Sequence, residues 1–386
     1  MTFIACGLPT IATCAAIAQA SRGIDNEQPH LEGRAVPPGF ATTNGTHFTI
    51  DGRSEYLVGT NAYWLPFLTN NADVDLTMDQ LQASGIKVLR TWGFNDVTSI
   101  PTDPSTVWFQ YLSSSGSIIN TGANGLQRLD YVVAAAEKRG LKLIIPFVNH
   151  WQDYGGIPAY TSAFGTGGST WYKHQPAQAQ YRLYVKELVS RYAASPAIFA
   201  WQLANEPRCM LCSTDDIFNW ATTTSEYIKS LDPYHMVTIG DEGQGLTGDV
   251  WPPYWLIFGT DFARNLQIKT IDFGTFHMYP TTWGVPLSFA YNWIRSHASK
   301  CVAFGKPCYL EEYGVPSSRG HCEVESEWQT WALQTEGIAG DGFWQVGTTL
   351  STGPTHDDTF TIYHDSPEWT CLVTDHVENV RNISAT

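Results

Sequence analysis

Basic residues and long hydrophobic runs are both scarce in this sequence. Its 386 residues include 22 lysines and arginines against 37 aspartates and glutamates, which gives a formal net charge of −15. Nucleic acids and anionic membrane surfaces attract basic patches, so this charge argues against both as partners. The apolar stretch at the start is short and is interrupted by Pro9, and no other run approaches the length of a membrane-spanning helix. We therefore expect neither nucleic acid nor a membrane as a partner, and a neutral substrate fits.

The sequence also lacks a linker rich in proline, serine and threonine, and no small cysteine-rich module is visible, so we expect no appended binding domain. Residues 1–20 are uncharged and mostly small or apolar, and Ala18-Gln19-Ala20 fits the cleavage site of a secretory signal peptide. Residues 21–39 are expected to form an N-terminal extension, or a pro-segment that ends at Arg34. Residues 40–386 remain as one catalytic domain, of a length that is normal for an α/β barrel.

Cysteine usage agrees with export to an oxidising compartment. Two of the eight cysteines fall in the predicted signal peptide, which leaves an even number for disulfides. Six cysteines allow fifteen pairings; sequence proximity favours Cys209–Cys212 and Cys301–Cys308, which leaves Cys322–Cys371. Half of a zinc site or a redox motif is the alternative for Cys209–Cys212, and it is disfavoured because no second ligand pair accompanies it. Two sequons, at Asn44 and Asn382, would accept glycans in a eukaryotic secretory pathway.

Eight apolar runs have the character of buried strands. They are Tyr56–Trp64, Val88–Phe94, Lys142–Trp151, Ile198–Pro207, Met236–Gly243, Asp272–Pro280, Pro307–Gly314 and Gly340–Gly347. Helical patterns lie between them, at Leu129–Gly140, Tyr181–Tyr192 and Ile217–Leu231. Alternating strands and helices predict a parallel sheet, here a single closed (β/α)8 TIM barrel. An open doubly wound sheet is the alternative, but Gly59–Trp64 is not the glycine-rich phosphate turn that would follow its first strand.

Two of the predicted strands end in a glutamate. Trp201-Gln202-Leu203-Ala204-Asn205-Glu206-Pro207 closes the fourth strand, and Tyr309-Leu310-Glu311-Glu312-Tyr313-Gly314 closes the seventh. Retaining glycoside hydrolysis uses two carboxyl groups roughly 5–5.5 Å apart, one to protonate the leaving oxygen and one to attack the anomeric carbon. One such strand has an ordinary structural explanation, but two of them within an eightfold repeat predict this chemistry.

Active sites of (β/α)8 barrels lie at the C-terminal ends of the strands. Polar and aromatic side chains gather at these ends in the predicted barrel: Arg90, Asn149, Trp151, Asn205, Glu206, Glu242, His277, Tyr279, Glu312 and Trp344. Any one of them could be a loop residue or a satisfied buried group. Their convergence on one face predicts an active site.

The ordered set of motifs resembles clan A of the glycoside hydrolases, and within it family 5 and its fungal endo-β-1,4-mannanases. The resemblance extends from about residue 40 to the C-terminus, and it is carried by Gly59–Trp64, Leu89–Asp96, Asn149–Gly156, Asn205–Cys209, His277–Pro280 and Glu311–Gly314. These mannanases often carry a disulfide at the positions of Ala62 and Leu65, which this chain lacks. Its six remaining cysteines match the other three bridges of the family, which supports the pairing given above.

The resemblance implies the central catalytic roles. Glu206 is the expected general acid/base and Glu312 the expected nucleophile, while Asn205 corresponds to the residue that bonds the 2-hydroxyl of the substrate. Arg90 and Tyr279 correspond to contacts of the nucleophile, and a cation and a hydroxyl donor there would keep Glu312 ionised. Glu206 faces that negative charge in a partly dry cleft, so we expect its pKa to be raised.

The resemblance also implies roles around this pair. Trp344 corresponds to a sugar platform beneath the cleaved residue, and Arg208 and Trp151 correspond to contacts on the leaving-group side. We also expect Trp92 and Glu242 to bind the substrate or to support the residues that do.

Two further residues are harder to place from the sequence. His277 would bond Glu206 or a sugar hydroxyl, with a zinc ligand or a plain core histidine as the alternative. Glu311 precedes the nucleophile on a strand and must point to the opposite side, so we expect it to pair behind the barrel wall.

The implied protein is a secreted, monomeric, endo-acting and retaining hydrolase of β-1,4-mannosidic bonds in mannan, galactomannan and glucomannan. This chemistry needs no metal ion and no organic cofactor. Another family 5 activity, endo-β-1,4-glucanase, is the main alternative. Mannose and glucose differ only at C2, and the spacing of motifs in the sequence does not distinguish an enzyme for one sugar from an enzyme for the other. A non-catalytic glycan-binding barrel is a third possibility, against which the presence of both Glu206 and Glu312 argues.

Overall fold

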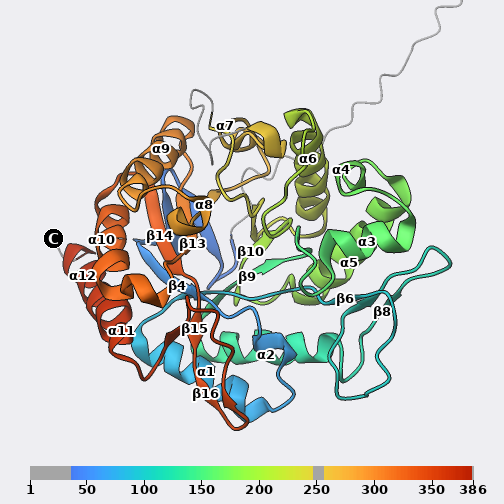
Figure 1. Cartoon of the computed structure of the whole chain (residues 1–386), viewed down its shortest axis with the longest axis horizontal. Helices are drawn as coiled ribbons and strands as arrows, with labels where there is room; N and C mark the ends of the chain where they lie inside the picture. Colours follow the sequence, from blue (N-terminus) through green and yellow to red (C-terminus); the bar gives the residue numbers. More distant parts are fainter. Residues whose placement is uncertain (1–35, 247–255, 385–386) are drawn as a thin grey trace, which may run out of the picture. The chain divides into compact units, whose positions relative to one another are not determined.

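The computed structural model of the protein describes residues 36–246 and 256–384 (Figure 1). The predicted signal peptide and all but the last residues of the predicted 21–39 extension lie outside the described residues. Among the described helices, none is long and apolar enough to cross a membrane.

Eight parallel strands form the central sheet of the described chain, in the order β11-β10-β9-β5-β4-β14-β13-β12. Their bounds are β4 (Leu57–Asn61), β5 (Val88–Arg90), β9 (Lys142–Pro146), β10 (Ile198–Gln202), β11 (Met236–Thr238), β12 (Gly274–Met278), β13 (Cys308–Tyr313) and β14 (Ile338–Phe343). Each of the eight predicted strand runs overlaps one of them. Neighbours in the sheet are also neighbours in sequence, apart from the β14–β4 pairing, where the end of the series returns to its beginning. This order is that of a (β/α)8 barrel, so the predicted fold is confirmed and the open doubly wound alternative is wrong.

The remaining seam of the barrel lies between β11 and β12, where the strands are joined by separate hydrogen bonds rather than a continuous ladder. The backbone amide of Asp272 donates to the carbonyl of Val237 at 2.8 Å, and that of His277 donates to the carbonyl of Glu242 at 3.0 Å. The Thr238 hydroxyl also donates to the carbonyl of Phe273, directly before β12, at 3.0 Å. These contacts bring Glu242, in the connection after β11, beside His277.

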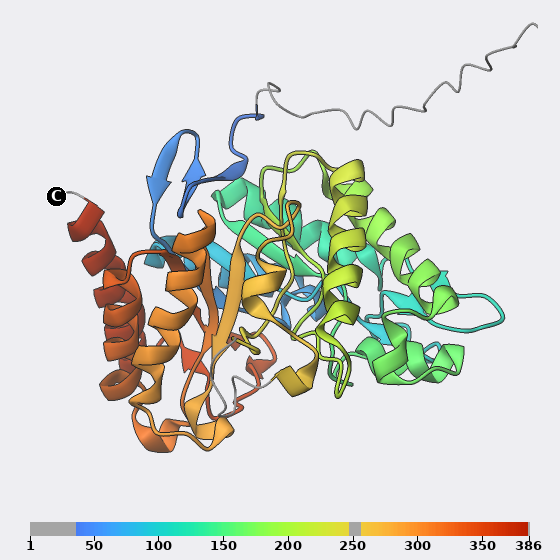
Figure 2. The same ribbon diagram turned by 90° about the horizontal axis from the view of Figure 1, so that it is seen from above.

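A three-stranded antiparallel sheet closes the N-terminal end of the barrel: β1 (Ala41–Asn44), β2 (His47–Ile50) and β3 (Arg53–Glu55). Its central strand projects Phe48 into the interior, where the ring packs 5.0 Å from Phe199 and 5.1 Å from Phe273 between ring centroids. These residues belong to a buried cluster formed by the strand starts, and Figure 2 shows the small sheet in blue at this end. Because the N-terminal end is filled with apolar side chains, polar chemistry is left to the opposite end.

Helices surround the barrel and bury a second, larger apolar layer against its outer face. The longer ones are α1 (Asn71–Ser84), α2 (Leu126–Arg139), α3 (Gly156–Phe164), α5 (Gln175–Tyr192), α6 (Thr214–Leu231), α9 (Phe289–Phe304), α10 (His321–Gln334) and α12 (Asp375–Ser384). The three predicted helical segments fall in α2, α5 and α6. Helix α2 stops where Gly140 adopts a left-handed conformation (φ 66°), as the glycine after Lys138 and Arg139 predicts.

Short elements fill the connections. The helical ones are η1 (Leu65–Phe67), α4 (Gly168–Trp171), η2 (Leu256–Phe258), α7 (Phe262–Asn265), α8 (Pro280–Trp283), η3 (Ser317–Arg319), α11 (Pro367–Trp369) and the π-helical η4 (Thr370–Thr374). The extended ones are β6 (Asp96–Val97), β7 (Gln110–Tyr111), β8 (Ile118–Ile119), β15 (Val346–Gly347), β16 (Thr349–Leu350), β17 (Gly353–Pro354) and β18 (Ile362–Tyr363).

All three predicted disulfides are present in the structure. Cys209–Cys212 closes a short loop after β10, Cys301–Cys308 joins α9 to β13, and Cys322–Cys371 joins α10 to η4. Both sequon asparagines are exposed, Asn44 at the turn of the first hairpin and Asn382 in α12. Attachment of glycans to them stays a prediction.

Candidate active site

A cleft of about 670 Å³ opens at the C-terminal ends of the barrel strands. It is lined by Tyr63, Trp92, Asn149, Trp151, Asp153, Tyr154, Asn205, Glu206, Tyr279, Glu312, Trp344, His356 and Asp358. Eight of the predicted site residues are in this lining. Of the remaining four, Arg90, Arg208 and His277 contact lining residues, and Glu242 pairs with Arg208.

Glu206 and Glu312 face one another across this cleft. A carboxylate oxygen of Glu206 lies within 4.8 Å of one of Glu312, and both residues are more than nine-tenths buried. Glu206 follows β10 in a left-handed backbone conformation (φ 49°), which non-glycine residues adopt only when the surroundings enforce it. Its amide is held by the carbonyl of Gly240 at 3.0 Å. The turn after β10 therefore fixes the direction of this carboxylate.

Glu312 is held by a cation and a hydroxyl. The Arg90 guanidinium donates to Oε1, and the Tyr279 hydroxyl donates to Oε2 at 2.8 Å. Arg90 is itself fully buried and donates to Asn205 Oδ1 at 2.6 Å and to Gln202 Oε1 at 2.8 Å. Such a buried network is stable only when its donors and acceptors are paired, so Arg90 fixes the two catalytic strands relative to each other.

The surroundings of Glu206 are different. His277 Nδ1 lies 2.7 Å from Oε1, and the indole Nε1 of Trp151 donates to Oε2 at 2.6 Å. Its neighbour Asn205 donates to Asn149 Oδ1 at 2.9 Å, which fixes the orientation of the Asn205 amide. Each oxygen of Glu206 therefore has a fixed partner before any ligand arrives.

Aromatic rings form one wall of the cleft. Trp344 stacks on Tyr63 with a centroid separation of 5.5 Å and an interplanar angle of 10°, and the Trp92 ring lies 5.9 Å from that of Trp344. The indole Nε1 of Trp344 donates to Asp358 at 2.8 Å, and the Arg90 guanidinium lies 4.8 Å from the centre of the Trp92 ring. A wall of this kind offers a flat apolar face of the type on which sugar rings stack.

Arg208 is fixed at the other end of the cleft. Two of its guanidinium nitrogens donate to the two oxygens of Glu242, one of them at 2.6 Å, and the Trp151 and Phe258 rings lie 4.8 and 4.6 Å away. A planar guanidinium suits this bidentate, stacked arrangement better than a lysine would.

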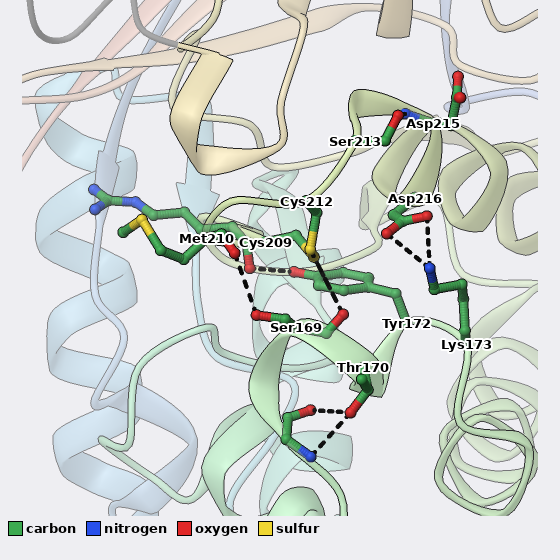
Figure 3. The surroundings of a disulfide bond; sticks show 12 residues. Ser169, Thr170, Tyr172, Lys173, Cys209, Met210, Cys212, Ser213, Asp215 and Asp216 are labelled. Atoms are coloured by element: carbon green, nitrogen blue, oxygen red, sulfur yellow. Dashed lines mark hydrogen bonds and ion pairs between the residues drawn. A yellow bond between two sulfur atoms is a disulfide. The ribbon is translucent and has the colours of Figure 1, made fainter.

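The Cys209–Cys212 disulfide supports this arrangement from behind. Within its loop, the Cys209 amide donates to the carbonyl of Phe258 at 2.7 Å. The Tyr172 hydroxyl donates to the carbonyl of Arg208 at 3.0 Å, and Ser169 lies against the two sulfurs (Figure 3). The loop that the bridge closes therefore begins directly after Arg208 and is bonded to the residue whose ring packs on it, Phe258. Because the two sulfurs are bonded to each other, neither is a free thiolate for zinc, and the pair forms the disulfide that we expected from the sequence.

Both ring nitrogens of His277 face a carboxylate. Its Nδ1 contacts Glu206, and its Nε2 lies 3.2 Å from Oε2 of Glu311, at full burial. The hydrogen bond to Glu206 is the arrangement expected from the sequence.

Comparison with known proteins gives a consistent family assignment. Residues 162–349 match a family model described as glycoside hydrolase family 5, β-mannosidase-like. The mannan endo-1,4-β-mannosidase A of Podospora anserina is 58% identical over 347 residues, which cover 89% of this chain and 92% of the relative. The enzyme of the same name from Aspergillus aculeatus is 54% identical and covers 93% of this chain and 95% of the relative. The chain belongs to glycoside hydrolase family 5. Among solved structures, the endo-1,4-β-mannanase of Rhizomucor miehei superimposes on this family 5 chain with a TM-score of 0.82 at 32% identity, covering 89% of this chain and 99% of that one.

The electrostatics of this family 5 site differ from the sequence-based expectation. Burial raises the pKa of Glu206, but the hydrogen bond and charge of His277, together with Arg208 and Trp151, outweigh it and bring the pKa to about 2. Burial raises the pKa of Glu312, and His277 and Arg90 oppose this rise. The expected raised pKa of Glu206 is therefore wrong for the unliganded cleft, because the sequence did not show how closely His277 approaches this carboxylate.

His277 carries the compensating shift. Burial lowers its pKa, but the charges of Glu312 and Glu206 and hydrogen bonds to Glu206 and Glu311 outweigh burial and raise the pKa to about 10. These shifts favour a proton on the imidazole of His277 over one on the carboxyl of Glu206, across a contact of 2.7 Å.

Several neighbours in this site were missed by sequence reasoning. Tyr63 lies two residues beyond the end of β4, within the first predicted strand run, and could have been chosen by the same rule as Trp344. Asp358 and His356 lie in the long connection after β14, where no periodicity marks them. Glu311 was misplaced: it points into the barrel beneath the site rather than behind its wall, with Gln202 donating to both of its oxygens at 2.7 and 2.9 Å.

Proposed function

We propose that the protein is a secreted, endo-acting, retaining hydrolase that cleaves internal β-1,4-mannosidic bonds in mannan, galactomannan and glucomannan. The observation that carries the proposal is the pair Glu206 and Glu312, whose carboxylate oxygens approach within 4.8 Å. That separation matches retaining enzymes, in which the nucleophile attacks the sugar directly, rather than inverting enzymes, which leave roughly 6.5–9.5 Å for a water molecule. The mannan substrate is supported by the names of relatives that are 58% and 54% identical.

In the first displacement, Glu312 attacks the anomeric carbon while the carboxyl of Glu206 gives a proton to the leaving oxygen. Arg90 and Tyr279, which contact the two oxygens of Glu312, orient the attacking carboxylate. Asn205 directly precedes Glu206, and its amide is held by Asn149 and by Arg90, which also contacts Glu312. A fixed amide in this place suits a contact with the 2-hydroxyl, which strengthens in the transition state.

In the second displacement, Glu206 acts as base and a water molecule attacks the glycosyl-enzyme ester. The departing Glu312 recovers its hydrogen bonds to Arg90 and Tyr279, so the carboxylate leaves into a prepared environment. Two inversions at the anomeric carbon give overall retention.

The two ends of the cleft suggest how the polysaccharide lies. The Trp344 and Tyr63 wall would stack against the sugar that is attacked, and Trp151 with Arg208 would contact the leaving-group side. Trp151 is 41% exposed even though its indole nitrogen reaches Glu206, so its ring can meet a sugar directly. Three disulfides and the predicted signal peptide support secretion.

The test is release of reducing sugar from galactomannan and from a soluble cellulose derivative, side by side, with Glu312→Ala as the inactive control. We expect release from galactomannan, early loss of viscosity that marks internal cleavage, and a β-anomeric product in the first minutes by NMR. Release from the cellulose derivative alone would replace the mannanase proposal with the endoglucanase alternative. An α-anomeric first product would refute the retaining mechanism, and no release from any glycan would favour a binding protein.

A further inference from the structure

Glu311 is a fully buried carboxylate for which the double-displacement steps above have no use. It immediately precedes the nucleophile on β13, yet both glutamates reach the same network. The pairing of β12 with β13 explains this: Phe276 pairs with Leu310, and the next residue, His277, pairs with Glu312. Glu311 is therefore the extra residue of a β-bulge, which re-aims side chains at functional sites.

The contacts of Glu311 form a chain to the acid/base. Gln202 donates to both of its oxygens, and Arg90 Nε lies 3.3 Å from Oε2. His277 Nε2 lies 3.2 Å from the same oxygen, while the opposite ring nitrogen lies 2.7 Å from Glu206. An acceptor-only carboxylate at Nε2 requires a proton on that nitrogen. Nδ1 is then left to exchange its proton with Glu206.

We propose that Glu311 is a positioning residue that keeps a proton on Nε2 of His277, so that Nδ1 of His277 stores and returns the proton that Glu206 uses in catalysis. The inference rests on the proposed function. Before the first displacement, the Nδ1 proton passes to Glu206, which leaves a neutral imidazole bonded through Nε2–H to Glu311. The Glu206 carboxyl then gives that proton to the leaving oxygen as the glycosidic bond breaks and the bond to Glu312 forms.

The proton balance closes in the second displacement. Glu206 takes a proton from the attacking water as the bond to Glu312 breaks, and it returns this proton to Nδ1. Over one cycle the water molecule supplies one proton to the released alcohol and a hydroxyl to the sugar. No other acid or base is consumed.

The charges that face His277 favour this role. Carboxylates outnumber cations around the ring. Glu206, Glu311 and Glu312 lie beside it and Asp241 and Glu242 lie near it, whereas the cations are Arg90, which contacts Glu311 and Glu312, and Arg208, which pairs with Glu242. Nδ1 is also only 3.5 Å from Oε2 of Glu312. Removing one anion from this set should weaken the hold on the stored proton.

The test compares Glu311→Gln with Glu325→Gln as a matched control. Glu325 is also fully buried and accepts from a histidine, with His321 Nδ1 2.9 Å away, but it lies on α10 outside the cleft. The first readout is the ¹⁵N NMR titration of the His277 ring, assigned through a His277→Gln variant. We expect both ring nitrogens to be protonated at neutral pH in the wild type. In Glu311→Gln, His277 should lose a proton at a pH at least one unit lower.

The second readout is the pH profile of kcat/KM on galactomannan. Without the anion at position 311 the proton is lost at lower pH, so the basic limb of Glu311→Gln should move down by one unit or more. The loss of activity in Glu311→Gln should appear mainly in kcat. This loss should be severalfold smaller on an aryl mannobioside with a good leaving group, because departure of that group needs little acid assistance. Glu311→Asp should restore part of the shift. Glu325→Gln should lower the melting temperature and leave both readouts unmoved.

An unshifted His277 titration and basic limb in a folded Glu311→Gln protein would overturn the proposal. If that variant does not fold, the wild-type spectrum alone decides: a neutral His277 at neutral pH with a bare Nε2 would be equally fatal. The NMR readout does not depend on turnover. A wild-type protein inactive on every mannan would therefore refute the proposed function while the link from Glu311 to His277 is judged separately.

Discussion

Replacing Arg90 by methionine should separate the catalytic from the structural contribution of the buried network. The guanidinium contacts Glu312, Glu311 and Asn205 at full burial. The variant therefore leaves the carboxylates of Glu311 and Glu312 buried without the arginine that pairs with both. Breaking a buried ion pair from one side typically costs about 3–5 kcal/mol. We expect a loss of stability of that order, measured as the free energy of unfolding in urea.

The pH profile should change in a defined direction. The Arg90 cation lowers the pKa of Glu312, so its removal raises that pKa and moves the acidic limb of kcat/KM to higher pH. His277 and Tyr279 still contact Glu312 in the variant, so only part of the stabilisation of the ionised carboxylate is lost. We therefore expect the acidic limb to move upward and to remain visible.

The rate should fall as well, even at the new optimum. Loss of one charged hydrogen bond to the nucleophile costs about 1.5–3 kcal/mol, which corresponds to a decrease in kcat of about ten- to a hundredfold. Arg90→Lys keeps the charge but loses the fork that reaches Asn205 and Gln202. It should therefore show the rate loss with a much smaller shift of the acidic limb.

Arg139→Met is the control for loss of a shielded arginine. Its guanidinium is also largely buried and pairs with Asp75 at 2.9 Å and Asp79 at 2.6 Å, between α2 and α1. This variant should lose stability and keep the wild-type pH profile. If Arg90→Met instead keeps an unshifted acidic limb and a near-normal rate at its own optimum, Arg90 serves only the packing of the barrel, and our account of Glu312 fails.

Three further perturbations follow from the same geometry. Glu312→Ala should abolish hydrolysis of every mannan, and a fluorinated mannosyl inhibitor should label Glu312 in the wild type; label on another carboxylate would contradict the assignment. Glu206→Ala should still be glycosylated by substrates with good leaving groups and should regain turnover with azide as a β-mannosyl azide, whereas an α-azide would contradict retention. Replacing Cys209–Cys212 by serines should raise KM through Arg208 before it lowers the melting temperature, while serines in place of Cys301–Cys308 should do the reverse; equal effects from the two pairs would remove the special role of the first bridge.

The barrel and its reactive end could be predicted from the sequence because both depend on repetition. Apolar runs of strand length alternate with helical periods, and this alternation alone requires a parallel sheet. In a parallel barrel, the C-terminal ends of all strands lie at the same end of the barrel. Glu206 and Glu312 each follow or end such a strand, so the fold predicts that they lie at the same end. The disulfides followed similarly, because short sequence separations leave few cysteines to choose from.

Contacts made by irregular segments could not be predicted in this way. Asp358 reaches the indole of Trp344 from a connection without periodicity, and Phe258 reaches Arg208 from a three-residue helix that no pattern marks. The predicted rise in the pKa of Glu206 was also wrong. This pKa depends on a 2.7 Å contact with His277, which lies on β12, across the seam between β11 and β12. A pKa is set by such distances, and a sequence contains none of them.

The case of Glu311 shows why a local rule can be correct and still give the wrong location. Side chains alternate between the two sides of a strand. Glu311 therefore points to the same side as Tyr309, which packs in the barrel interior, and to the opposite side from Leu310, which packs in the outer apolar layer. The rule was applied from Glu312 backwards, and the β-bulge breaks the alternation between those two residues. Because the inserted residue sends Glu312 to the mouth while Glu311 stays inside, two adjacent glutamates serve one network at different depths. A single inserted residue in β13 thus places the nucleophile and a buried anion on the same arginine and the same histidine.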